Sequence, residues 1–154
     1  MKKKIVKTSA VEKICALTLV LLIAFVAYLG YLYYDKNLPT FTADLSEITV
    51  EEKQSLIDGN YLELMEYPDS LQYVSVTVDE GVRETQYKLE FCVNKHEAQR
   101  YEIEKGGSPD NVGIKKISED DSKVYYEAST NFTTGSGSSR WSYVKSLAEK
   151  YEVK

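Results

Sequence analysis

The longest uniform stretch of the chain is a run of 21 uncharged residues from Ile14 to Tyr34, with the sequence ICALTLVLLIAFVAYLGYLYY. An α-helix rises about 1.5 Å per residue, so this run would extend for about 30 Å, which matches the hydrocarbon core of a bilayer. It lacks the polar face that a surface helix of a soluble protein has. The pattern predicts a transmembrane helix over residues 14–34.

Charge is distributed unequally on the two sides of this run. Five lysines and one glutamate give residues 1–13 a net charge of +4, and because the whole chain carries −5, the remaining residues carry −9. Flanks rich in lysine and arginine stay in the cytoplasm. We therefore predict a basic cytoplasmic tail at residues 1–13 and an extracytoplasmic location for residues 35–154, in the cell envelope.

A cleaved signal peptide is the alternative to this retained anchor, since it has the same basic and apolar regions. Its cleavage site has small residues spaced as in A-x-A, whereas the candidate triplets here read Phe-Val-Ala at 25–27 and Tyr-Leu-Gly at 28–30. The apolar run is also longer than the apolar region of a usual signal peptide. Both observations favour a retained anchor.

The outer part begins with residues 35–46, DKNLPTFTADLS, which have no periodicity and contain Pro39. We interpret them as a stalk, followed by one domain at residues 47–154. Thr49 and Glu52 have the spacing of a capping box, which predicts a helix that starts there and ends at residues 58–60.

Alternating apolar and polar residues at 71–79 and 85–93 predict an antiparallel hairpin that places Tyr73 and Cys92 on its more solvated face. Asn94 and Glu97 predict a helix over 95–105 that Gly106 and Gly107 close. A second hairpin is expected at 112–118 and 123–130, followed by a loop at 133–139 and a helix from Arg140. The fold class is therefore α+β, a two-layer domain with a mainly antiparallel four-stranded sheet in the order α-ββα-ββα.

The two cysteines are expected on different sides of the membrane, Cys15 in the anchor and Cys92 in the domain, so no disulfide can form within one chain. A free Cys92 thiol is the simpler interpretation, and pairing of Cys92 between chains is the alternative. Cys92 and His96 could form a nucleophilic pair, but His96 also has the surroundings of a surface histidine.

Three further segments have an ordinary interpretation beside a functional one. Residues 135–140, GSGSSR, could hold an anion before a helix or form a simple loop. The carboxylates at 119–121 lack calcium-loop spacing and suit a turn. Asn131 begins a glycosylation triplet. No catalytic residue, metal site or cofactor is predicted.

Tyrosine is unusually frequent, with 13 residues, and Tyr73 and Tyr125 are expected on the open face of the sheet. Tyrosine is common in protein interfaces. The sequence thus favours a non-enzymatic, single-pass membrane protein that binds another envelope protein through a face containing these two residues. The alternatives are an extracytoplasmic domain that binds a small molecule or cation, and a small exported enzyme. The net charge of −9 argues against nucleic acid as a partner.

Overall fold

The computed structural model describes residues 9–103, 113–133 and 139–153, and the chain divides into two compact units between Asn37 and Leu38. The first unit contains the 27-residue helix α1, Ala10–Lys36. Its capping box is complete, because the amide of Glu12 donates to Ser9 Oγ over 3.3 Å and the amide of Ser9 donates to Glu12 Oε2 over 2.9 Å. None of its residues is buried. The helix is long and apolar enough to span a membrane, as membrane anchors and signal sequences are.

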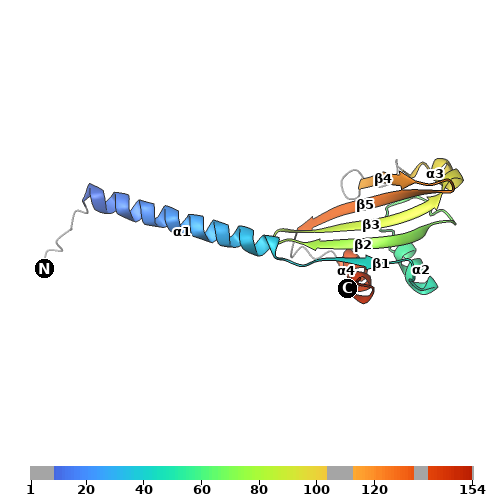
Figure 1. Ribbon diagram of the computed structural model, residues 1–154, viewed down its shortest axis with the longest axis horizontal. Coiled ribbons are helices and arrows are strands. Elements are labelled where there is room, and N and C mark those ends of the chain that lie inside the picture. Colours follow the sequence, from blue (N-terminus) through green and yellow to red (C-terminus); the bar gives the residue numbers. More distant parts are fainter. Residues whose placement is uncertain (1–8, 104–112, 134–138, 154) are drawn as a thin grey trace. The chain divides into compact units, whose positions relative to one another are not determined.

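The second unit is an antiparallel sheet with helices, which confirms the predicted α+β class. The sheet has five strands in the order β1-β2-β3-β5-β4, which lie side by side in Figure 1. The strands are β1 Thr40–Asp44, β2 Gln72–Glu80, β3 Glu84–Asn94, β4 Gly113–Glu119 and β5 Lys123–Thr133.

The predicted count of four strands is wrong, because β1 forms within the segment that the sequence analysis interprets as a stalk. Its five residues, TFTAD, carry little apolar side chain, so alternation alone gives a weak signal. β1 is stabilised by pairing with β2, where Ala43 lies opposite Val76 and is fully buried. The strand therefore depends on a partner more than thirty positions away in the chain.

Three helices accompany the sheet: α2 Val50–Asp58, α3 Lys95–Arg100 and α4 Ser139–Lys150. The predicted capping box of α2 is confirmed, with Glu52 N–Thr49 Oγ1 at 3.2 Å and Thr49 N–Glu52 Oε2 at 3.0 Å. The helix α3 is shorter than the predicted 95–105. Glu102 adopts the left-handed conformation, φ 46°, directly after its C-terminal cap, and this conformation is frequent where helices end.

The predicted cap of α3 also differs from the structure. The side chain of Asn94 makes no capping hydrogen bond. Glu97, its expected partner, instead accepts hydrogen bonds from the backbone amide of Ser70 at 3.0 Å and from the Ser70 hydroxyl. The carboxylate thus joins α3 to the segment before β2. Gly106 and Gly107 lie outside the described residues.

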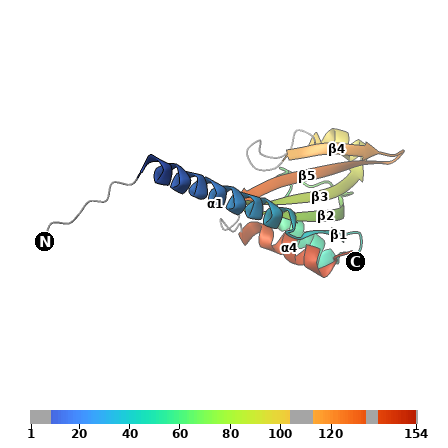
Figure 2. The same ribbon diagram turned by 60° about the vertical axis from the view of Figure 1, so that its left-hand side comes forward.

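The core lies on the helix-covered face of the sheet, where α4 packs on β1 and β2 and α3 packs on β3 and β5 (Figures 1 and 2). Trp141 of α4 is 1% exposed, and its ring lies 5.0 Å from Tyr61, 5.3 Å from Tyr87 and 5.8 Å from Phe132 between centroids. The opposite face is polar, as hydroxyl pairs such as Thr42–Thr77 at 3.0 Å indicate. The domain therefore has two layers with one apolar core.

Candidate functional site

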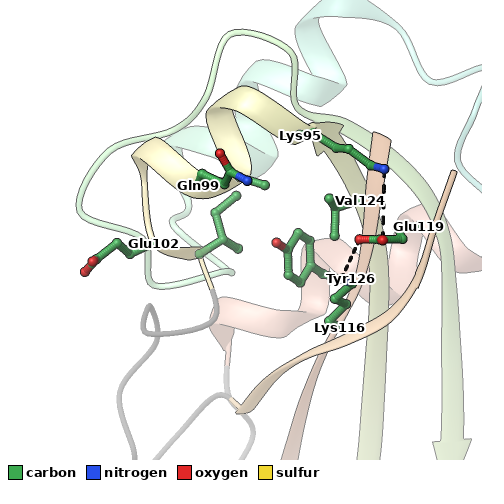
Figure 3. A pocket seen from close by; sticks show the side chains of 9 residues that line it. Lys95, Gln99, Glu102, Lys116, Glu119, Val124 and Tyr126 are labelled. Carbon is green, nitrogen blue, oxygen red and sulfur yellow. Dashed lines mark hydrogen bonds and ion pairs between the residues drawn. The ribbon is translucent and has the colours of Figure 1, made fainter. Parts of the chain in front are cut away.

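One hollow of the domain, which we name the α3–β4 hollow, lies between α3, β4 and β5 and has a volume of about 310 Å³ (Figure 3). Its apolar part comes from Ala98, Ile103, Val124 and Tyr126. The β-alternation of β5 turns Val124 and Tyr126 toward the helix-covered face, where both are buried. The hollow is large enough to receive one large apolar side chain.

Charged side chains surround this apolar floor: Lys95, Glu102, Lys116 and Glu119. Glu119 is shared by two lysines, with Lys116 Nζ at 2.5 Å and Lys95 Nζ at 4.0 Å (Figure 3). The hydrogen bond from Lys116, followed by the positive charges of Lys116 and Lys95, lowers the pKa of Glu119. Because these side chains are partly exposed, the ion pairs orient groups at the rim more than they stabilise the fold.

The strand beside this hollow is an edge of the sheet. Among the described residues, β5 is the only strand that pairs with β4, so the outer edge of β4 has no strand partner. All residues of β4 except Ile114 are exposed. The pairing register shifts between Lys116 and Ser118, and Ile117 at this irregularity is 44% exposed. Such an edge offers backbone N–H and C=O groups to another extended chain.

A second hollow, which we name the Cys92 hollow, has a volume of about 390 Å³ and contains both tyrosines that the sequence analysis selected. Tyr125 is half-buried, but Tyr73 is only 3% exposed. The expected exposure of Tyr73 is therefore wrong. A bulge between Tyr73 and Ser75 shifts the alternation of β2, so Tyr73 lies opposite the buried Phe91. Tyr73 and Tyr125 line one hollow but do not form an exposed aromatic patch.

Cys92 is 3% exposed, which corrects the expectation that it lies on a solvated surface. Its thiol lies 3.9 Å from the amide oxygen of Gln72, as a weak hydrogen bond. Burial raises the pKa of the thiol, and a nucleophilic cysteine requires the opposite shift. His96 is exposed on α3, and no hydrogen bond among the described residues joins it to Cys92. This geometry does not favour the Cys92–His96 pair as a catalytic centre.

The remaining candidates are explained locally where the structure describes them. Asp120 accepts hydrogen bonds from the amides of Ser122 and Lys123, each at 2.8 Å, so it builds the β4–β5 turn. No group of three or more metal-ligating side chains occurs among the described residues. Asn131 is exposed on β5. Residues 134–138 of the serine-glycine segment lie outside the described part of the chain. Cys15 and Cys92 are both free thiols.

The sequence analysis did not identify the α3–β4 hollow, because the hollow forms only where α3 and the residues after it lie beside the hairpin of β4 and β5 in the folded domain. Only the alternation of β5, which predicts that Val124 and Tyr126 share a face, was a usable local signal. Comparisons with protein-family models, with curated proteins and with solved structures find no match for this chain. The helix, the edge strand and the two hollows are therefore the features of this chain that bear on its function.

Proposed function

We propose that this chain is a single-pass membrane protein whose second unit, residues 38–154, lies outside the cytoplasm and binds an extended segment of another envelope protein. The exposed edge of β4 beside the α3–β4 hollow is the observation that carries the binding proposal. An extended chain that adds to a sheet edge gains main-chain hydrogen bonds, and a pocket for one of its side chains supplies specificity.

The membrane part of the proposal rests on helix α1 and its flanks. Its apolar residues are exposed, for example Leu22 at 59% and Phe25 at 59%, and lipid would cover them in a bilayer. The net charge of +4 before the helix favours a cytoplasmic N-terminus. This arrangement would hold the domain at the membrane surface, where its partner would also be found.

The charges of β4 define the partner further. Lys115 and Lys116 occupy the middle of the edge strand. Lysines on an edge oppose pairing with an identical strand, because antiparallel pairing would bring like charges together. A partner segment with an acidic residue near a large apolar residue would place its carboxylate beside Lys116, which lines the hollow, and would fill the hollow with the apolar side chain. The net negative charge of the domain would oppose it only weakly, since salt screens exposed charges beyond about 8 Å.

Topology is tested by adding protease to intact cells that produce the full-length protein. We expect digestion of the domain and survival of an N-terminal fragment that still contains residues 1–13. Mass measurement of the membrane-bound protein should give an N-terminus before Ile14. A mature product that begins beyond Tyr34, or a domain that stays intact while a known extracytoplasmic protein is digested, would contradict the proposed anchoring or orientation.

Partner binding is tested with a photo-crosslinking amino acid at Gln99, an exposed residue that lines the hollow. Its matched position is Lys88, on the uncovered face of β3. We expect a discrete crosslinked envelope protein from position 99 and none from position 88. The crosslink should disappear in Ala98→Phe, which fills the hollow, and persist in Ser129→Phe, which adds the same ring on the other face of β5.

Hydrogen exchange then separates strand addition from other contacts. The isolated partner segment should slow the exchange of β4 amides in the full-length protein while β2 amides stay unchanged. Crosslinks that are equally strong from positions 88 and 99, or that resist Ala98→Phe, would refute binding at the hollow. Binding without protection of β4 would refute strand addition.

A further inference from the structure

The Cys92 hollow differs from the α3–β4 hollow in charge. Its lining contains two lysines, Lys53 from α2 and Lys123 from β5, and no carboxylate. The α3–β4 hollow contains two lysines and two glutamates. In a part of the chain whose net charge is −9, a hollow lined only by positive charged groups is a local reversal of sign. Ligands of negative charge are thereby favoured at this place.

The ammonium groups of Lys53 and Lys123 have N–H donors available for a ligand. No side-chain hydrogen bond or ion pair within the described part of the chain involves Lys53. Lys123 Nζ donates to Gln72 Oε1 over 2.8 Å, and an ammonium group has three donors. Neither lysine is fully exposed, since both are half-buried. Partial burial strengthens the attraction between an ammonium group and an anion relative to the same pair in water.

The acidic side chains of Asp120 and Glu90 lie outside the lining and accept hydrogen bonds from other groups. The Asp120 carboxylate accepts two backbone amides of the β4–β5 turn and the hydroxyl of Tyr125, which lies 3.1 Å from Oδ2. Glu90 accepts a hydrogen bond from the Ser75 hydroxyl at 3.0 Å. Both carboxylates therefore have hydrogen-bond donors of their own, although the charge of Asp120 still acts on Cys92.

Apart from Ser46, Gln72 and the two tyrosines, the rest of the lining is apolar. Leu45 and Cys92 are buried, and Ile48 and Val74 are half-buried beside them. Burial keeps the Cys92 thiol protonated and uncharged, so it acts as apolar surface and does not repel an anion. The volume of about 390 Å³ is within the range of small-molecule sites, which combine an apolar wall with a few polar groups.

We propose that the Cys92 hollow binds a small organic anion, with an apolar body against Leu45 and Val74 and a carboxylate, sulfonate or phosphate group between Lys53 and Lys123. This site is separate from the α3–β4 hollow and does not depend on the proposed protein binding. The apolar wall distinguishes it from a site for an inorganic anion, and the two lysines distinguish it from a site for a neutral lipid-like molecule.

The test is a titration of the isotope-labelled full-length protein in nonionic detergent micelles, followed by NMR of the backbone amides. Four probes separate the contributions: 4-phenylbutyrate, the matched alcohol 4-phenylbutanol, the matched cation 4-phenylbutylammonium, and inorganic phosphate. We expect 4-phenylbutyrate to give saturable shifts at residues 45–48, 72–74 and 123–125. The alcohol should bind about tenfold more weakly, in line with the loss of one charge-assisted hydrogen bond, and phosphate alone should give no saturable shift.

Substitutions of Lys53 and Lys123 show whether these lysines bind the carboxylate of the probe. Lys53→Gln and Lys123→Gln should each weaken binding of 4-phenylbutyrate several-fold, and the double variant should remove the difference between acid and alcohol. Lys88→Gln, at a half-buried position of β3 outside the lining, should leave binding unchanged. Native spectra of each variant show that the fold is kept. Equal binding of acid and alcohol, an unchanged affinity in the double variant, or the absence of saturable shifts at 10 mM 4-phenylbutyrate would overturn the proposal.

Discussion

The two edges of the sheet differ in whether another segment of the chain pairs with the outer strand. At the β1 edge, the end of the chain returns and pairs, since Val153 N donates to Thr42 O at 3.0 Å and Asp44 N donates to Tyr151 O at 3.3 Å. At the β4 edge, no described strand or terminal segment pairs with the outer side. Unpaired edges invite association, and proteins cover or charge them to prevent it. Here one edge is covered and the other is charged.

This difference indicates a division of roles within one small domain. On the side of the covered β1 edge, contacts between distant residues link β1, α2 and α4. For example, Lys150 Nζ and Tyr151 Oη each donate a hydrogen bond to the Glu52 carboxylate over 2.7 Å. The β4 side is held mainly by its pairing with β5 and a local turn. Stability should therefore depend on the covered side, whereas β4 should tolerate change and remain accessible to the partner that we propose.

The largest loss of unfolding free energy is expected from a substitution in α4. Trp141→Ala removes a ring in contact with Tyr61, Tyr87 and Phe132, and a buried aromatic replaced by alanine costs about 3–5 kcal/mol of unfolding free energy. This loss is measured by unfolding the full-length protein in micelles with urea and following the hydrogen exchange of β3 amides. Trp141→Phe should cost less. A loss below about 1 kcal/mol for the alanine variant would contradict the central role of this cluster.

A smaller effect is expected at the start of α2. Thr49→Ala removes the hydroxyl that accepts the Glu52 amide at 3.2 Å, and the loss of an N-cap costs about 1 kcal/mol. The matched variant Ser9→Ala removes the equivalent cap of α1 in the other unit. Unfolding of the domain should respond to Thr49→Ala and not to Ser9→Ala. Equal effects of the two variants would contradict the division into two units.

Acid should weaken the covered side through Glu52. Hydrogen bonds from Lys150, from the Thr49 amide and from Tyr151 lower the pKa of Glu52 from 4.5 to about 2. Because the folded pKa is the lower one, the stabilisation is present above about pH 4.5 and is lost as the pH falls toward 2. The unfolding midpoint in urea should therefore fall less between pH 5 and pH 2.5 in Glu52→Gln than in the wild type. Glu51→Gln, at an exposed neighbour, should keep the wild-type slope.

The smallest change in unfolding free energy is expected from a substitution in β4. Ile117 lies at the irregularity of the edge strand and is 44% exposed, so Ile117→Ser should change the unfolding free energy by about 0.5 kcal/mol or less. The same urea titration measures it. A loss comparable to that of Trp141→Ala would show that β4 belongs to the stable core, and the contrast between the two edges would then fail.

Local signals in the sequence predicted much of this fold. The apolar run marked the helix α1, the pair Thr49 and Glu52 marked the start of α2, and alternation marked the strands β2, β3, β4 and β5. Each of these signals is contained in a few neighbouring residues, where helix capping and strand alternation act directly. The α+β class followed from their order along the chain.

The candidate sites were less predictable, because they depend on non-local pairing. The bulge after Tyr73 reversed the expected exposure of this residue, and the packing around Cys92 buried a thiol that alternation had placed in solvent. The α3–β4 hollow arises only because β5 lies between β3 and β4 in the sheet. No spacing in the sequence encodes that order, since the pairing of distant strands is decided by the total packing of the domain.

By itself, the sequence determined the apolar helix, the basic N-terminal flank, the acidic remainder and the helix and strand periods, since each is a property of consecutive residues. Only the tertiary structure decided the fifth strand, the covered and uncovered edges, and the gathering of Lys53 and Lys123 around Cys92. The physical reason is that β1 has too little apolar surface to form a strand alone and is stabilised once β2 and the chain end lie beside it.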